Sequence, residues 1–88
     1  MFRVEFGPAA QSSAAEMVPN EVLLRALEML RAVGETAAEL ERVSGRSLGS
    51  GPARLMLQTA GFHLHYMLDL ESRTISVFSI VRSLGATG

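Results

Sequence analysis

Apolar and polar residues alternate along residues 61–69 in the pattern typical of a strand with one buried face. One side of this pattern carries only apolar side chains, namely Phe62, Leu64, Tyr66 and Leu68. The other side carries His63, His65 and Met67, and so holds both histidines of the chain. We predict that the first side is core, and that the second side is where any chemistry would occur.

Similar patterns predict three more strands. Residues 53–59 and 74–82 flank the middle strand, and Thr59-Ala60-Gly61 and residues 70–73 form tight connections between them. At the start of the chain, residues 2–6 (FRVEF) alternate apolar and charged side chains, which indicates a half-buried strand. The last three strands are expected to be antiparallel.

Two helices are expected between the first and second strands. Residues 8–17 are Ala-rich and follow Gly7-Pro8, where proline suits the first helical position. After Pro19, apolar residues recur at spacings of three and four as far as Val43. Gly34 interrupts that series at a cost of about 1 kcal/mol relative to alanine, so residues 19–43 are either one helix or two helices broken near Gly34. Residues 44–52 are expected to be a flexible loop that carries Arg46.

The order of elements predicts an α+β fold, β-α-α-β-β-β. Two N-terminal helices pack on one face of a small, mainly antiparallel four-stranded sheet, in one domain over residues 1–88. The other face of the sheet is left open. An open face in a small soluble protein usually binds a ligand or is covered by a partner.

Composition narrows the class of protein. No apolar run reaches the roughly 18 residues that span a bilayer, and the N-terminus lacks the apolar core of a secretion signal. Cysteine is absent, which excludes disulfides and thiolate metal sites. We therefore expect a cytoplasmic protein with no membrane contact and no cofactor. The net charge of −1 argues against a general nucleic-acid coat, although the charge is uneven: −3 over residues 1–42 and +2 over residues 43–88.

Several segments, in this order, resemble the RelE/ParE superfamily of bacterial type II toxin–antitoxin toxins. FRVEFGPAA is similar to the first strand and helix start of the family, and VPNEVLLRALEML to its amphipathic second helix. RLMLQTAGFHLHYMLD is similar to the family's central hairpin, and ISVFSIVR to its last strand. The resemblance covers nearly the whole chain. It implies a toxin partnered by a cognate antitoxin, which either cleaves mRNA in the ribosomal A site (RelE branch) or inhibits DNA gyrase (ParE branch).

The RelE site residues carry over only in part. The second strand of the family carries two basic residues. The first of them matches Arg54, and the other falls on Met56, which cannot contact phosphate. The hairpin arginine falls on His63, and the arginine of the last strand matches Arg82. The C-terminal SLGATG offers nothing to match the Tyr or His that the family often places there. The family site is therefore incomplete in this chain.

Cleavage of RNA by its 2′-hydroxyl needs a base, an acid and cations for the phosphorane charge. We assign catalysis to His63 and His65, as base and acid, together with Arg82 as a clamp on the phosphate, and RNA or phosphate binding to Arg54 and Arg46. Under the family alignment, both histidines, Arg54 and Arg82 point from one face. For Arg82 this requires the face that it shares with Phe78 and Ile80, which have the same parity, to be the open one.

Other interpretations remain open. Two histidines on an open sheet face need no catalytic role. A His-X-His metal site is a weaker hypothesis, because only Asp69 lies near enough to add a ligand. Met56 and Met67 are candidates for binding an antitoxin segment laid across the sheet or its edge, together with Phe78 and Ile80. Phe78 and Ile80 are equally compatible with ordinary core positions.

Three functions are therefore compared: a RelE-like, ribosome-dependent mRNA endonuclease; a ParE-like toxin that binds gyrase; and a non-catalytic family member that serves as an interaction module. The missing arginines weigh against full ribonuclease activity, because phosphate contacts dominate affinity for RNA.

Overall fold

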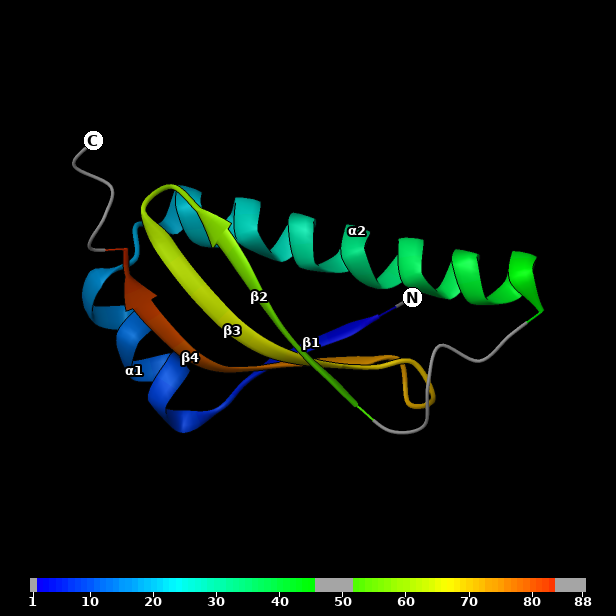
Figure 1. Ribbon diagram of the computed structural model, residues 1–88. Helices are drawn as coiled ribbons and strands as arrows, with labels where there is room; N and C mark the ends of the chain where they lie inside the picture. The colour runs from blue at the N-terminus through cyan, green and yellow to red at the C-terminus, as the bar shows by residue number, and fades with distance from the viewer. Residues whose placement is uncertain (1, 46–51, 84–88) are drawn as a thin grey trace.

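The computed structural model describes residues 2–45 and 52–83. It contains β1 (Arg3–Phe6), α1 (Pro8–Met17), α2 (Asn20–Ser44), β2 (Ala53–Thr59), β3 (Phe62–Asp69) and β4 (Thr74–Arg82) (Figure 1). The strands form one sheet in the order β1-β4-β3-β2. The β1–β4 pair is parallel, and the other two pairs are antiparallel. The predicted α+β fold and order of elements are confirmed.

The predicted helix over residues 19–43 is a single helix, α2, that runs through Gly34. Gly34 is buried, and a Cβ atom at this position would lie 2.8 Å from Cγ of Phe2. The glycine therefore lets the helix approach the ring of Phe2 closely rather than breaking the helix. The helix ends at Ser44, and the following Gly45 has a φ of 68°, the left-handed conformation common just after helix C-termini.

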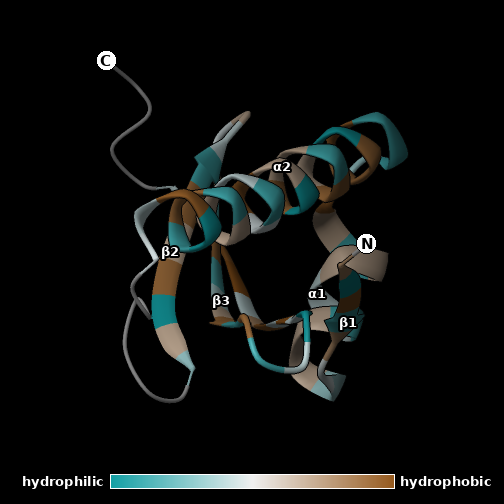
Figure 2. Cartoon of the chain, turned by 90° about the vertical axis from the view of Figure 1, so that its right-hand side faces the viewer, coloured by the Kyte–Doolittle hydropathy of each residue, from teal (hydrophilic) through white to brown (hydrophobic). Residues whose placement is uncertain are grey.

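The core lies between α2 and one face of the sheet. Phe62, Leu64, Tyr66 and Leu68 are all buried on that face, as the alternation of residues predicts. Opposite them, α2 contributes Ala26 and Leu30, which are 1% and 0% exposed. Figure 2 shows α2 crossing above the strands, with hydrophobic and hydrophilic bands alternating along β2.

The shorter helix, α1, packs against β4 beside the point where β1 ends (Figure 1). The last parallel pair is Phe6 with Val77, and the amide of Gly7 then donates a hydrogen bond of 2.9 Å to the Val77 carbonyl. Ala10 on α1 is completely buried. The two helices thus cover different parts of the sheet, and both pack against it.

A β-bulge in β4 changes which of its residues face α2. His65 pairs with Ser79, but the next residue, Tyr66, pairs with Val77, so Phe78 is an extra residue in the strand. Residues before and after the bulge therefore face α2 with opposite parity. This corrects the expectation that Phe78 and Ile80 share a face: Ile80 is 3% exposed in the core, whereas Phe78 is 39% exposed.

Among the described residues, no helix is both long enough and apolar enough to cross a membrane.

Candidate functional site

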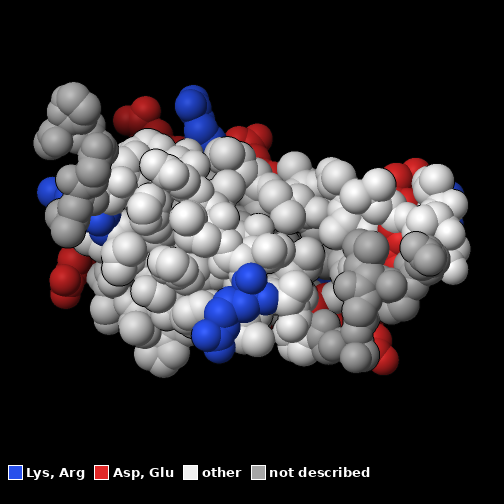
Figure 3. All heavy atoms as spheres, viewed as in Figure 1, with Lys and Arg blue, Asp and Glu red and all other residues white. Residues whose placement is uncertain are grey.

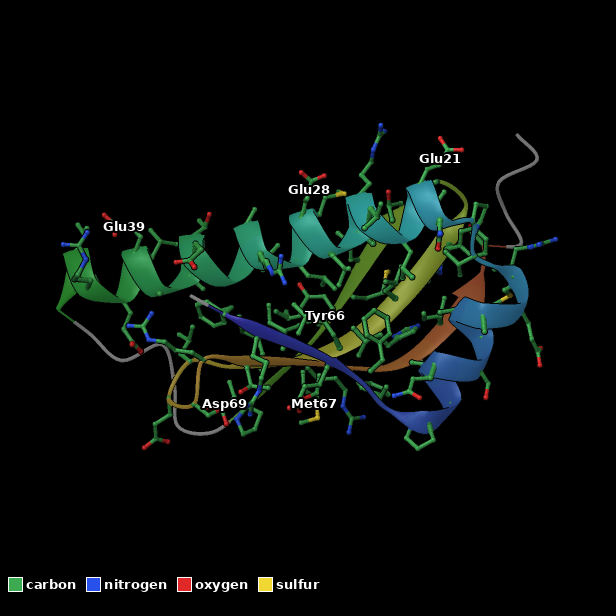
Figure 4. The ribbon with its side chains drawn as sticks, turned by 180° about the vertical axis from the view of Figure 1, so that it is seen from behind. Glu21, Glu28, Glu39, Tyr66, Met67 and Asp69 are labelled. Carbon is green, nitrogen blue, oxygen red and sulfur yellow. The ribbon has the colours of Figure 1, made fainter. Side chains whose placement is uncertain are left out.

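The face of the sheet turned away from α2, here called the open face, carries the alternate residues of each strand. Cross-strand pairing places Met67 beside Arg54, His65 beside Met56, and His63 beside Gln58. Directly opposed side chains in an antiparallel pair point to the same side of the sheet. Figure 4 shows the division: Tyr66 lies between the sheet and α2, while Met67 and Asp69 lie on the other side.

The structure brings three side chains together on the open face, one from each of three neighbouring strands. The guanidinium carbon of Arg54 on β2 lies 5.5 Å from the ring centre of Phe78 on β4. The ring of His65, on the intervening strand β3, has its centre 6.2 Å from that of Phe78, at an interplanar angle of 43°. We call Arg54, His65 and Phe78 the open-face cluster. A cation, an imidazole and an exposed aromatic ring are thus within reach of one ligand.

His63 lies next to this cluster, two residues before His65, in a more enclosed position. Its Nε2 atom is buried and has no hydrogen-bond partner among the described residues. A buried, unsatisfied polar atom costs about 1–3 kcal/mol, so this nitrogen is a weak point in the packing of the sheet. The two predicted catalytic histidines share a face, but His65 makes the contact with Phe78.

The structure does not bring Arg82 to the histidines. Arg82 pairs with Phe62, whose side chain faces α2, and its guanidinium carbon lies 5.8 Å from the centre of the Phe62 ring. The bulge at Phe78 is the cause, because it reverses the parity of the strand before Arg82 is reached. The expectation that Arg82 points from the open face is therefore wrong.

The remaining predicted site residues fall in three places. Met56 and Met67 both lie on the open face, where Met56 is 47% exposed. Arg46, predicted to contact phosphate, lies outside the described residues. Asp69, the nearest candidate for a third metal ligand, accepts a hydrogen bond of 3.0 Å from the Glu71 amide in the turn after β3. The described part of the chain contains no group of three or more His, Cys, Asp or Glu residues that could hold a metal ion.

Charge on the open face is sparse in the described ranges. On β1, Arg3 and Glu5 form an ion pair of 3.0 Å between two exposed side chains. Arg54 has no ion-pair partner among residues 2–45 and 52–83. Its guanidinium is therefore available to an anion.

Two other features do not contribute to this site. Burial raises the pKa of the Tyr66 hydroxyl, but Tyr66 faces α2 and not the open face. A groove between α1 and α2 is lined by Phe6, Gln11, Ala14, Ala15, Val18, Asn20 and Leu23. No side chain in that lining titrates, so the groove offers no acid–base chemistry.

Phe78 is the member of the open-face cluster that sequence reasoning did not assign to the RNA site. The polar positions of its strand change parity in the sequence, from Ser76 to Ser79, and this change is the one signal of the bulge that turns the ring outward, because neither glycine nor proline occurs in residues 74–82. An aromatic residue without a charged neighbour was equally compatible with the core.

Comparison with known proteins gives a match in structure alone. No protein-family model and no curated protein sequence matches the chain. The intact RelBE toxin–antitoxin complex of E. coli contains a chain that is 19% identical, with a TM-score of 0.58 over 94% of this chain and 98% of that one. The isolated E. coli RelE toxin is 18% identical, with a TM-score of 0.58 over 94% and 85% of the two chains. A mutant of E. coli RelE bound to an antitoxin RelBc peptide also scores 0.58, at 18% identity over 93% and 83%.

At this level of identity the comparisons show the fold. The chain has the fold of the RelE toxins, as the resemblance in sequence implied.

Proposed function

We propose that the chain is the toxin of a type II toxin–antitoxin system, and that it inhibits translation by cleaving mRNA on the ribosome, as the RelE branch does. The observation that supports this proposal best is the open-face cluster on a RelE-like fold, where Arg54, Phe78 and His65 meet. Such a toxin acts in the cytoplasm, where ribosomes and mRNA are found.

Each member of the cluster has a role in this proposal. Arg54 binds the scissile phosphate, because a guanidinium donates paired hydrogen bonds to phosphate oxygens. Phe78 stacks on a base, which every nucleobase permits. His65 accepts the proton of the 2′-hydroxyl as that oxygen attacks the phosphorus, and its imidazolium then donates the proton to the departing 5′-oxygen, since imidazole exchanges protons near neutral pH. His63 lies two residues before His65 on the same face of β3.

A cognate antitoxin is the partner that this proposal requires. Two of the E. coli RelE structures with this fold contain an antitoxin, RelB or a RelB peptide. On the present chain, Met56 and Met67 lie on the open face with Phe78, and these apolar side chains suit an antitoxin segment laid across the sheet. An antitoxin bound there covers the cluster and blocks RNA.

Induced expression in bacteria tests this function. The unaltered chain should arrest growth, and primer extension should show new 5′ ends within the coding regions of mRNA. Arg54→Ala and His65→Ala should each reduce both effects at least tenfold, whereas Arg31→Ala, on the exposed side of α2, should leave them unchanged. Normal growth and intact mRNA under the unaltered chain would overturn the proposal.

A second candidate is a toxin that acts by binding alone, as the ParE branch does on DNA gyrase. The apolar character of the open face favours it, since Val81 and Phe78 are 43% and 39% exposed. Expression should then induce the DNA-damage response and leave mRNA uncut. A supercoiling assay in which purified gyrase keeps its activity would discard this candidate.

A non-catalytic interaction module is the remaining alternative. It predicts a stable complex with the product of the adjacent reading frame but no growth arrest. Co-purification tests this, and the absence of any complex would count against all three interpretations.

A further inference from the structure

The outer edge of β2 is the strongest unexplained surface of the molecule. β2 is the last strand of the sheet, and it pairs with β3 along its whole length, from Ala53–Leu68 to Thr59–Phe62. No other strand in the described part of the chain pairs with its outer side. Figure 3 views the molecule from the side on which β2 lies, where one small group of basic atoms stands among mostly uncharged atoms.

The turn between β2 and β3 determines which backbone groups point outward. Ala60 and Gly61 have φ values of 48° and 84°, which is typical of a two-residue type I′ hairpin. Such a turn closes on a hydrogen-bonded pair, here Thr59 with Phe62, and the hydrogen-bonded pairs then alternate along the ladder. The amides and carbonyls of Arg54, Met56 and Gln58 therefore point away from β3.

This edge lacks the usual features that prevent strands from pairing. Natural edge strands are protected by bulges, prolines, lysines or charged residues in the middle of the strand. β2 has a regular register, contains no proline, and carries its one charge, on Arg54, near one end. Leu55 and Met56, in the middle of the strand, are 39% and 47% exposed.

We propose that the edge of β2 pairs with β2 of a second copy of this chain, antiparallel and centred on Met56. In that register Met56 of one copy faces Met56 of the other. The outward-pointing amides and carbonyls of Arg54, Met56 and Gln58 form the hydrogen bonds between the two strands. Arg54 faces Gln58 of the second copy, and Leu55 faces Leu57 of the second copy. Apolar side chains therefore meet apolar ones on both faces of the joined sheet.

The length of β2 favours this register over its neighbours, and the charges are compatible with it. The two Arg54 side chains stand about 13 Å apart along the strand direction, at about 3.3 Å per residue, so they do not repel strongly. Sliding one strand by two residues towards Pro52 places Gln58 opposite that proline, which has no amide to donate. The register centred on Met56 is the one that uses all of β2.

The pairing has a consequence for the candidate site. The two-fold axis is perpendicular to the sheet, so both open faces lie on the same side of one eight-stranded sheet. The two open-face clusters then share one continuous surface.

A cysteine at position 56 tests the proposal directly, because the chain has no cysteine of its own. The two Cα atoms at the axis lie about 5.5 Å apart in a hydrogen-bonded antiparallel pair, a distance at which a disulfide forms. Met56→Cys should give a covalent dimer under mild oxidation. The matched control is Met67→Cys, on the same face but on the inner strand β3, and it should remain uncrosslinked.

Light scattering of the purified full-length chain provides the second measurement. The unaltered chain should have twice its 9.5 kDa mass, and Met56→Lys should be monomeric because two lysines then oppose each other. Mixing Met56→Lys with Met56→Glu should restore the dimer. A monomeric unaltered chain, or a Met56→Lys variant that remains dimeric, would overturn the proposal. The proposal would also be overturned if the chain were monomeric and the amides at the edge of β2 were protected from hydrogen exchange only when antitoxin is bound.

Discussion

The guanidinium of Arg54 lies over the ring of Phe78, although the strands that carry them are separated by β3. On β3 the residue paired with Arg54 is Met67, and the ring of His65, two residues earlier, also meets Phe78. The side chain of Phe78 is thus held between a cation and an imidazole, and its position depends on the bulge in β4. This arrangement is the physical basis of the first prediction.

Arg54→Ala should weaken binding of short single-stranded RNA, and it should also change the salt dependence. Losing one phosphate contact reduces the slope of log K against log salt by about 0.7 for a single strand. Arg54→Lys should keep the slope but bind less tightly, because lysine loses the planar stacking on Phe78. Fluorescence anisotropy over a range of salt concentrations measures both quantities.

The control for this experiment is Arg31→Ala, which removes the same charge from the exposed side of α2. Its slope should equal that of the unaltered chain. Equal slopes for Arg54→Ala and Arg31→Ala would show that Arg54 contacts no phosphate.

Because of the bulge, truncating two apolar residues of β4 that are two positions apart should lower the free energy of unfolding by very different amounts. Ile80→Ala should lower the free energy of unfolding by about 2–5 kcal/mol, because Ile80 is 3% exposed in the core. Phe78→Ala should cost about 1 kcal/mol or less, since that ring lies on the open face and is 39% exposed. Urea denaturation followed by circular dichroism measures both. Without a bulge the two residues would share a face, and the two costs would be similar.

Most of the fold follows from local patterns in the sequence. The alternation of Phe62, Leu64, Tyr66 and Leu68 assigned the buried face of β3 correctly, because a period of two allows only two faces. The helix over residues 19–43 was equally visible from its apolar spacing. The sequence did not show whether Gly34 breaks that helix, because the answer depends on a contact with Phe2, over thirty residues away in the chain.

The candidate site was harder to predict than the fold. His65 and Arg54 were placed on the correct face because β2 and β3 pair without irregularity. Arg82 was placed wrongly because one extra residue in β4 reverses the parity of everything after it. Phe78 was considered for the open face only as an antitoxin contact, because an apolar ring gives no sign of acid–base chemistry. A bulge arises from the fit between strands, which a single sequence does not display.

The close approach of Gly34 to Phe2 gives a third prediction. In an exposed helix, Gly→Ala stabilises by about 1 kcal/mol. Here the new Cβ would lie 2.8–3.0 Å from three atoms of a buried ring, so overpacking of about 1–3 kcal/mol opposes that gain. Gly34→Ala should therefore be neutral or destabilising, and adding Phe2→Leu to Gly34→Ala should cost less than Phe2→Leu does alone. Urea titration of the four proteins in this double-mutant cycle measures the coupling.

Thr36→Ala is the control, at an exposed position of the same helix, and should stabilise by a few tenths of a kcal/mol, up to about 0.7. Gly34→Ala stabilising by a full 1 kcal/mol would mean that the ring of Phe2 moves aside freely.

Tyr66 makes the stability of the fold depend on pH in the alkaline range. Burial raises the pKa of its hydroxyl above the ordinary value of about 10, because the phenolate is poorly solvated beneath α2. Between the unfolded and folded pKa values the unfolded chain has lost this proton while the folded chain still holds it. The native state then binds more protons, so the contribution of Tyr66 to the free energy of unfolding is constant below about pH 10 and is lost as the pH rises through the folded pKa. The chain has one tyrosine, no lysine and no cysteine, and arginine stays charged throughout, so Tyr66 is the side chain that titrates in this range.

Urea denaturation at intervals from about pH 8 to about pH 11.5 should show the decline, and Tyr66→Phe should remove it. An equal decline in Tyr66→Phe would assign the effect to some group other than this hydroxyl.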